Sequence, residues 1–228
     1  PAGVKFAVLP LPERVVKGQG TFVLTASTEA VLLSGDDSLA CVTGALADVL
    51  EPVFGKGLRV RHADVPLDGA LNISCGAAMP ADGYRLEITP GRAEIVAGSA
   101  AGAFYAVQTL RQLIPAAAYG AANVRAVELP VVTIEDKPCL GYRGMMLDVC
   151  RHFSPIGEVK RFIDILALHK LNVFHWHLSD DQGWRIEIEK YPLLTEKGAV
   201  RRVTDLNKNS SGHYAPQTVG TEYGRGLF

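Results

Sequence analysis

The sequence has few cysteines: only Cys41, Cys75, Cys139 and Cys150 occur in 228 residues. No two of them form a CxxC pair, so neither a zinc site nor a redox-active dithiol is predicted, and four are too few for a disulfide-stapled scaffold. If residues 139–150 are extended, their end cysteines lie about 36 Å apart, which excludes a local disulfide. We therefore expect mostly buried thiols.

Net charge and long apolar runs are also lacking. The 23 basic and 24 acidic residues give a formal charge of −1, so no overall field attracts nucleic acid or an anionic membrane. No run approaches the roughly 18 apolar residues of a membrane span. The sequence begins at Pro1 without a Met or a signal-like apolar stretch, although a cleaved export signal could have preceded it. These absences favour a neutral partner.

The first part of the chain, residues 1–137, is predicted to be a small α+β domain with an antiparallel sheet and two helices. Apolar residues at helical spacing predict helices over 38–53 and 99–114, ended by Gly55 and Pro115. Strands are predicted over 58–61, 69–74, 84–89 and 93–97, the last two forming a hairpin through residues 90–92. No acid pair, His cluster or phosphate loop occurs there, so we expect a structural module without chemistry.

A change of pattern near Pro130, Pro138 and the polar residues 135–137 predicts a domain boundary, and a second domain is expected over 138–228. The order is strand 142–149, helix 154–170 and strand 172–178, which is a βαβ unit. Ser154 is predicted to cap the helix, with Pro155 at its first position. The predicted buried stripe of the helix consists of Val159, Phe162, Ile163 and Leu166.

The two predicted strands end in polar residues: Arg151 and His152 follow the first strand, and Asp180 and Asp181 follow the second. Parallel strands joined by a crossover helix place their carboxyl ends on one rim, where α/β sheets and barrels bind ligands. We therefore predict one site from both motifs. A full eight-fold barrel needs about 250 residues, so the chain is expected to hold only its first units, as a truncated barrel.

Each candidate residue in this site has an alternative interpretation. The Arg151 fork can hold two neighbouring hydroxyls or a carboxylate, or it can form an ion pair with Asp148. Asp180 and Asp181 can accept from sugar hydroxyls or orient a histidine, whereas Asp181 equally suits a turn cap. Trp184 can stack on a sugar face or pack beneath a loop.

His175 and His177 share one face of the second strand because strand side chains alternate. Two such imidazoles followed by an Asp could ligate zinc in a metal-dependent barrel hydrolase. The competing interpretation is a pair of histidines satisfied by neighbouring protein groups. A non-catalytic carbohydrate-binding fragment is a further alternative, using Arg151 and Trp184 without turnover.

Residues 141–153 (GYRGMMLDVCRHF) and 170–185 (KLNVFHWHLSDDQGWR) resemble glycoside hydrolase family 20, the β-N-acetylhexosaminidases, and residues 83–114 resemble the small domain that precedes its (β/α)8 TIM barrel. The resemblance implies removal of terminal non-reducing β-linked N-acetylglucosamine or N-acetylgalactosamine with retention. The substrate's 2-acetamido oxygen is then the nucleophile and forms an oxazolinium intermediate. A Glu protonates the leaving oxygen, the Asp before it orients the acetamide, and no cofactor is implied.

By motif position, the resemblance implies that Arg151 grips the hydroxyls at carbons 3 and 4 of the sugar, and that Asp180 is a supporting acid. His177 and Trp184 are further candidates for substrate contact. The catalytic Asp–Glu pair of the family follows a later strand, so we expect the isolated chain to lack it and to be inactive. The resemblance also implies a secreted, periplasmic, cell-surface or lysosomal location, and the exposed edges of an incomplete barrel favour a homo-oligomer.

Overall fold

The structure is a computed structural model that describes residues 8–33, 39–76, 79–180 and 183–199, with the backbone of 207–208 and 214–215. The chain divides into two compact units, an amino-terminal unit of Pro1–Gly141 and a carboxyl-terminal unit of Tyr142–Phe228. Over the described residues, no helix combines the length and the apolar character that a membrane crossing requires.

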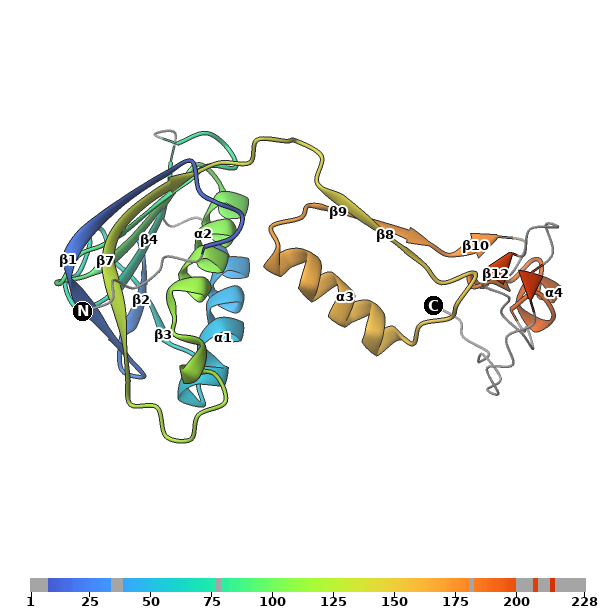
Figure 1. The fold of residues 1–228 in the computed structure, drawn as a ribbon, viewed down its shortest axis with the longest axis horizontal. Helices are drawn as coiled ribbons and strands as arrows, with labels where there is room; N and C mark the ends of the chain where they lie inside the picture. Colours follow the sequence, from blue (N-terminus) through green and yellow to red (C-terminus); the bar gives the residue numbers. More distant parts are fainter. Residues whose placement is uncertain are drawn as a thin grey trace. The chain divides into compact units, whose positions relative to one another are not determined.

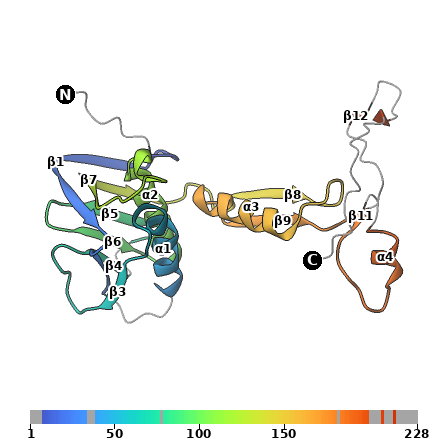
Figure 2. The same ribbon diagram turned by 90° about the horizontal axis from the view of Figure 1, so that it is seen from below.

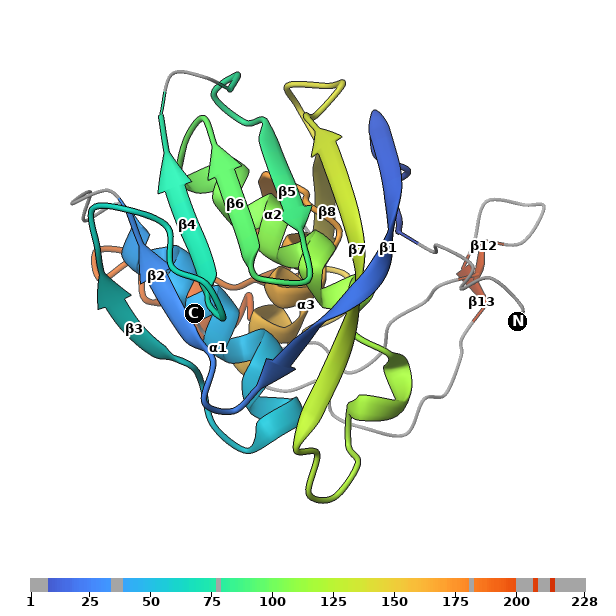
Figure 3. The same ribbon diagram turned by 90° about the vertical axis from the view of Figure 1, so that its left-hand side faces the viewer.

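The amino-terminal unit is built on one seven-stranded sheet, which Figure 3 shows with the strand order β1-β7-β5-β6-β4-β2-β3. Its strands are β1 (Arg14–Thr25), β2 (Glu29–Leu32), β3 (Arg59–His62), β4 (Leu71–Cys75), β5 (Tyr84–Ile88), β6 (Ala93–Ala97) and β7 (Ala126–Asp136). The pairs β2–β3, β2–β4 and β4–β6 are parallel, and β1–β7, β5–β7 and β5–β6 are antiparallel. The prediction of an antiparallel sheet is therefore wrong, because the sheet is mixed.

Helix α1 (Ala40–Phe54) explains the parallel part of the sheet. It connects β2 to β3 across one face and returns the chain to the end from which β2 started, so the two strands must run in the same direction. The second helix, α2 (Ala100–Leu113), follows β6 and lies on the same face as α1 (Figure 2). The sequence contains the helix that connects the strands, but it does not show which strands become neighbours.

Helix α1 ends, and helix α2 begins, at the residues that the sequence predicts. Gly55 follows α1 with φ +74°, and its N–H donates to the Glu51 carbonyl, which is the left-handed ending that glycine permits. Ser99 caps α2, with its hydroxyl accepting from the Gly102 N–H at 3.3 Å. The hairpin between β5 and β6 is confirmed by their antiparallel register.

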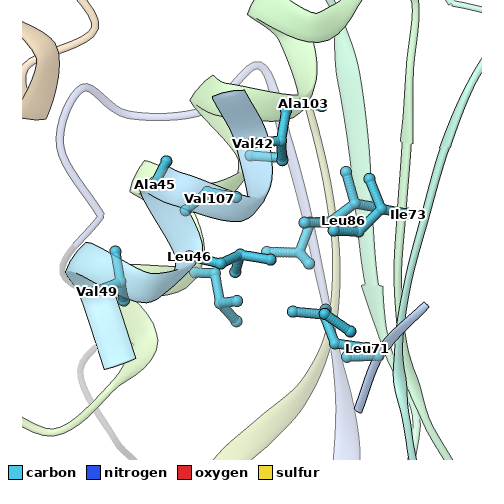
Figure 4. Close-up of a cluster of buried hydrophobic side chains, with 14 of the residues drawn as sticks. Val42, Ala45, Leu46, Val49, Leu71, Ile73, Leu86, Ala103 and Val107 are labelled. Atoms are coloured by element: carbon cyan, nitrogen blue, oxygen red, sulfur yellow. The ribbon is translucent and has the colours of Figure 1, made fainter. Parts of the chain in front are cut away.

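The core lies between the helices and the sheet (Figure 4). Leu46 of α1 is 2% exposed, and Val107 of α2 and Leu86 of β5 are fully buried. Burying one such side chain contributes roughly 1.5–3 kcal/mol. The opposite face of β5 and β6 carries ion pairs instead, such as Arg85–Glu87 at 2.7 Å and Arg92–Glu94 at 3.4 Å. At β5 and β6 the sheet is therefore apolar on one face and charged on the other.

The long ribbon of β1 and β7 contains an irregularity between Lys17 and Thr21, where the register shifts. Gly20 adopts φ +96° there, a conformation that favours glycine. Pro130 lies opposite Thr21 inside β7, next to the irregularity, where a proline's missing N–H is tolerated. Pro130 is thus a strand residue, and its prediction as a boundary marker is wrong.

The carboxyl-terminal unit begins with the predicted βαβ arrangement. β8 (Gly144–Asp148) and β9 (Val173–His177) pair in parallel and are joined by α3 (Ile156–Leu168), which lies beside them in Figure 1. The short elements that follow are β10 (Ser179–Asp180), β11 (Gly183–Trp184), α4 (Leu193–Glu196), β12 (Asn207–Lys208) and β13 (Tyr214–Ala215).

The start of α3 differs from the prediction by one residue. Pro155, not Ser154, occupies the capping position, and no side chain caps the helix. The Pro155 carbonyl accepts from the N–H groups of Glu158 and Val159, at 2.9 and 3.1 Å. Ser154 is buried before the helix. The fixed φ of proline starts the helix without a hydroxyl cap.

The predicted stripe of α3 is correct for three residues of four. Val159 and Leu166 are buried, and the Phe162 ring lies 5.6 Å from that of Phe174 on β9. Ile163 is 43% exposed, because the described ribbon is two strands wide and covers less than the full apolar stripe. Phe174 in turn stacks on Trp176 at 6.0 Å, so alternation leaves the two strand histidines for the opposite face.

Candidate active site

The carboxyl ends of β8 and β9 are in register, with Asp148 opposite His177. The chain turns directly after Asp148, whose Oδ1 accepts from the N–H groups of Cys150 and Arg151 at 2.9 and 3.1 Å. An Asp that binds the backbone two and three residues later stabilises a tight turn. This turn brings the Arg151 side chain back to the strand ends.

Arg151 joins three other side chains into a strand-end cluster, defined here as Asp148, Arg151, His177 and Asp180. Its Nη1 lies 3.0 Å from Asp148 Oδ2, 2.8 Å from Asp180 Oδ2 and 3.2 Å from His177 Nδ1. His177 Nε2 lies 3.2 Å from the same Asp180 oxygen. The four side chains remain 25–40% exposed, so a ligand can reach them.

The cluster stabilises the charged form of Asp148. Partial burial acts to raise the pKa of this carboxyl, but the N–H groups of Arg151 and Cys150 and the charges of Arg151 and His177 outweigh it, and the pKa falls below its ordinary value of 3.8. Burial, helped by the Asp148 charge, raises the pKa of the Cys150 thiol to about 11. Cys150 is therefore a neutral thiol at ordinary pH, and its Sγ donates to the His177 carbonyl at 3.2 Å.

The structure confirms that Arg151 and Asp180 meet at the ends of parallel strands, although they are 29 positions apart. It also bears out the alternative that Arg151 pairs with Asp148, because the guanidinium contacts both acids. His152 is exposed. Asp181 lies outside the described residues, so its predicted roles stay predictions.

Trp184 lies on β11, which pairs with β10, the strand that contains Asp180 of the strand-end cluster. In this pairing Trp184 is opposite Ser179. Its indole N–H donates to the Ile186 carbonyl at 2.7 Å, which supports the interpretation that it packs within the loop. Its ring is partly exposed. Stacking on a sugar stays a prediction.

The zinc interpretation of His175 and His177 does not fit the geometry. Within the described residues, the donors close enough for one ion are Asp148, Cys150 and His177, whose ligand atoms lie within 4.8 Å of one another, and His175 is not among them. Two of the three already contact the Arg151 cation, and the third is a neutral thiol. The Arg151 guanidinium therefore lies where an ion bound by Asp148 and His177 would have to sit, and the two positive charges would repel each other there.

A cavity of about 570 Å³ lies in the amino-terminal unit, at the amino ends of β2, β3 and β4. Lys56, Arg59, Arg61, Glu29 and Asp68 line it. Arg61 pairs with Glu29 at 3.5 Å, so opposite charges offset each other there. The strand-end cluster is therefore the better candidate for an active site.

Comparisons with known proteins agree with the motifs at the strand ends. Residues 140–223 match the family model described as glycosyl hydrolase family 20, catalytic domain, and residues 5–137 match the one described as glycosyl hydrolase family 20, domain 2. The chain belongs to glycosyl hydrolase family 20. The resemblance seen in the sequence is thereby confirmed.

Two curated relatives illustrate the likeness within family 20. The chain is 39% identical to a β-hexosaminidase of Porphyromonas gingivalis over 215 residues, which are 93% of this chain and 27% of that protein. It is 36% identical to a β-N-acetylhexosaminidase of Cellulomonas fimi over 213 residues, covering 92% and 41% of the two chains. The chain thus spans between about a quarter and two fifths of these relatives.

Solved structures of family 20 are similar in fold. An N-acetyl-β-hexosaminidase of Streptomyces plicatus in complex with Thio-NAglucal matches with a TM-score of 0.74 and 39% identity, over 83% of this chain and 38% of that chain. An exo-β-N-acetylglucosaminidase of Vibrio harveyi in complex with N-acetylglucosamine matches with a TM-score of 0.74 and 32% identity, over 85% and 29%.

Arg185 is the last residue of the second family 20 motif, but no role was predicted for it from the sequence. Its side chain is 2% exposed and binds the carbonyls of Val149, Cys150 and Ala199. Charged residues are rarely buried to this extent, so the residue type itself does not predict the burial of Arg185. Gly183, two residues earlier, is the one local signal, because an isolated glycine at a strand marks a close approach.

The cysteines also differ from expectation. Cys150 is buried and Cys75 half-buried, whereas Cys41 and Cys139 are exposed. The prediction of mostly buried thiols is therefore wrong.

Proposed function

We propose that this chain carries the sugar-gripping part of a β-N-acetylhexosaminidase that removes terminal non-reducing β-linked N-acetylglucosamine or N-acetylgalactosamine. The observation that carries the proposal is the contact of Arg151 with Asp180 at 2.8 Å, at the ends of two parallel strands. Membership of family 20, the names of the relatives and the complex of a similar structure with N-acetylglucosamine support it.

Each residue of the cluster has a proposed role. Arg151 binds the hydroxyls at carbons 3 and 4, because a planar fork of N–H donors matches two adjacent oxygens. Asp180 is a supporting acid, held by Arg151 and by His177 Nε2 at 3.2 Å. His177 lies between Asp148 and Asp180, and each of its ring nitrogens contacts one of the two carboxylates and holds it in place. Trp184 is a secondary candidate for contact with the sugar.

The reaction proposed for the whole enzyme retains the anomeric configuration and uses the substrate's own acetamido oxygen as nucleophile. We propose that β8, α3 and β9 form the first β/α/β unit of a (β/α)8 barrel within a domain that begins near residue 138. The acid Glu and the Asp that orients the acetamide then belong to a later strand, outside residues 1–228. The greater length of the relatives supports this division.

The test is the release of para-nitrophenol from para-nitrophenyl N-acetyl-β-glucosaminide by the gene product that contains residues 1–228. Proton NMR of the first product should show the β-anomer, and treatment with a chelator should leave the rate unchanged. Strict dependence on zinc would instead favour a metal-dependent hydrolase. Binding of N-acetylglucosamine in calorimetry without any turnover would favour a carbohydrate-binding protein. A location outside the cytoplasm and homo-oligomer formation stay predictions.

A further inference from the structure

We propose that Arg185 is a positioning residue that fixes the turn carrying Arg151. It thereby determines the position of the Arg151 guanidinium, which is proposed to bind the sugar. The claim that Arg185 fixes the turn concerns only the folded chain and does not depend on the proposed function. Its catalytic consequence rests on the proposed function.

The contacts of Arg185 concentrate on the residues between Asp148 and Arg151. Nε donates to the Val149 carbonyl at 3.0 Å, and Nη2 donates to the Cys150 carbonyl at 3.3 Å. These are the two residues of the turn that separate the acid from the arginine of the cluster. One rigid group thus holds both peptide units from the side opposite to the Asp148 carboxylate, which binds the turn's N–H groups.

Arg185 also connects other segments to the turn, through its guanidinium and through its backbone. Nη1 donates to the Ala199 carbonyl, and the backbone N–H of Arg185 donates to the Leu178 carbonyl at 3.0 Å. Leu178 stands between His177 and the β10 strand that bears Asp180. The guanidinium lies 5.3 Å from the centre of the Phe153 ring. A shift of Arg185 would therefore disturb both motifs of the site.

A buried guanidinium is costly unless its N–H groups are bound. Arg185 is 2% exposed, and three of its nitrogens donate to backbone carbonyls. The planar fork of arginine suits this task, because a lysine offers a single ammonium and cannot reproduce three fixed directions. The geometry therefore requires arginine for its shape as much as for its charge.

Gly183 provides independent support. A Cβ at this position would lie 2.8 Å from both Arg185 Nη2 and the Cys150 carbonyl oxygen. Such a side chain would separate the donor from its acceptor. Gly183 pairs with Asp180 in the β10–β11 register, so the close approach also joins the supporting acid to the turn. Glycine is needed here for space.

The first experiment measures how tightly the turn is held and needs no enzymatic activity. Iodoacetamide labelling of Cys150 in the folded gene product is followed by peptide mass spectrometry, with exposed Cys139 as internal reference. We expect Arg185→Met and Gly183→Ala each to raise the relative labelling rate of Cys150 by about tenfold, because the turn opens more often. Protection equal to that of the wild type would overturn the proposal.

The matched control is Arg143→Met. Arg143 Nε also donates to a backbone carbonyl, that of Lys170 at 2.9 Å, but it precedes β8 and lies at the other end of the βαβ unit. Its loss should leave Cys150 protection unchanged. Equal increases in labelling for both variants would reduce Arg185 to a general structural residue and would overturn the proposal.

The second experiment is a double-mutant cycle on kcat/KM for the aryl glycoside. Arg185→Met should lower kcat/KM by about tenfold or more when Arg151 is present, and by less than about twofold in an Arg151→Lys background, because the turn then has no fork to position. Equal losses in both backgrounds would show that Arg185 does not act through Arg151. Should Arg185→Met fail to fold, Arg185→Lys replaces it, with the same coupling expected.

The two experiments separate the two proposals. A wild-type protein without hexosaminidase activity, but with Cys150 labelling that depends on Arg185 and not on Arg143, would refute the proposed function and retain the geometric role. Normal hexosaminidase activity of the wild type, together with unchanged Cys150 labelling in Arg185→Met, would support the proposed function and refute the geometric role of Arg185.

Discussion

Arg151 Nη1 lies 2.8 Å from Asp180 Oδ2, across the carboxyl ends of β8 and β9. The same nitrogen contacts Asp148 at 3.0 Å, so one cation holds the acid that ends β8 and the acid of β10, which follows β9. An arginine that is already oriented by two carboxylates loses less conformational freedom when a ligand binds. The ion pairs thus hold the guanidinium in one orientation before a ligand binds.

Replacement of Arg151 by lysine should weaken this grip. We expect kcat/KM of the gene product for para-nitrophenyl N-acetyl-β-glucosaminide to fall by about 10- to 100-fold, since hydrogen bonds from a charged group contribute roughly 1.5–3 kcal/mol. Steady-state kinetics measures the loss. Arg161→Lys, on the exposed side of α3, is the control, and unchanged kinetics in Arg151→Lys would refute the assignment.

Asp180→Asn should reduce turnover with little effect on folding, because the amide keeps the shape of the carboxylate and removes its charge. A decrease in kcat of about 10- to 100-fold is expected, with a melting temperature close to that of the wild type. Asp164→Asn on α3, an exposed acid, should change neither quantity. A large loss of stability in Asp180→Asn would indicate a structural role.

Asp148 should make stability depend on pH in the acid range. Its pKa is lower in the folded chain than the ordinary 3.8, so its contribution is present above pH 3.8 and is lost as the pH falls through the lowered value. Asp148→Asn should therefore cost about 1–3 kcal/mol near neutral pH, and the difference from the wild type should shrink below pH 3.8. Urea unfolding between about pH 7 and pH 2 measures it, and a difference independent of pH would contradict the prediction.

Leu46→Ala tests the core of the amino-terminal unit. Leu46 is 2% exposed between α1 and the sheet, and truncation of a buried leucine costs about 2–5 kcal/mol. Calorimetry or denaturant unfolding should show a loss in this range. Leu11→Ala, at a side chain that is 82% exposed, should change stability by less than about 0.5 kcal/mol.

Elements with a complete local signal were predicted from the sequence. Helices α1 and α2 have an apolar stripe and a glycine or serine at one end, and the β5–β6 hairpin has its turn residues. Strand β1 escaped prediction because only Phe22 and Leu24 among its residues are buried, so little of it alternates. Strand β7 was hidden by Pro130, which lies beside the irregularity in its partner.

The strand order could not be predicted, because pairing depends on contacts between segments far apart in the chain. Local propensity is the same for a parallel and an antiparallel neighbour. At the site, the βαβ pattern was sufficient to bring Arg151 to Asp180. It could not reveal Arg185, because burial of a guanidinium depends on three carbonyls from two other segments, the turn at Val149 and Cys150 and the residue Ala199.

The two outer strands of the seven-stranded sheet both carry cations. Arg14 and Lys17 lie on β1, and exposed Arg59 and Arg61 lie on β3. Charged side chains on an edge strand disfavour the pairing of two sheets edge to edge, although Glu135 offsets part of the charge of Arg14 and Glu29 part of that of Arg61. We therefore expect the charged outer strands of the described sheet to disfavour the open-ended stacking of strands that leads to fibres.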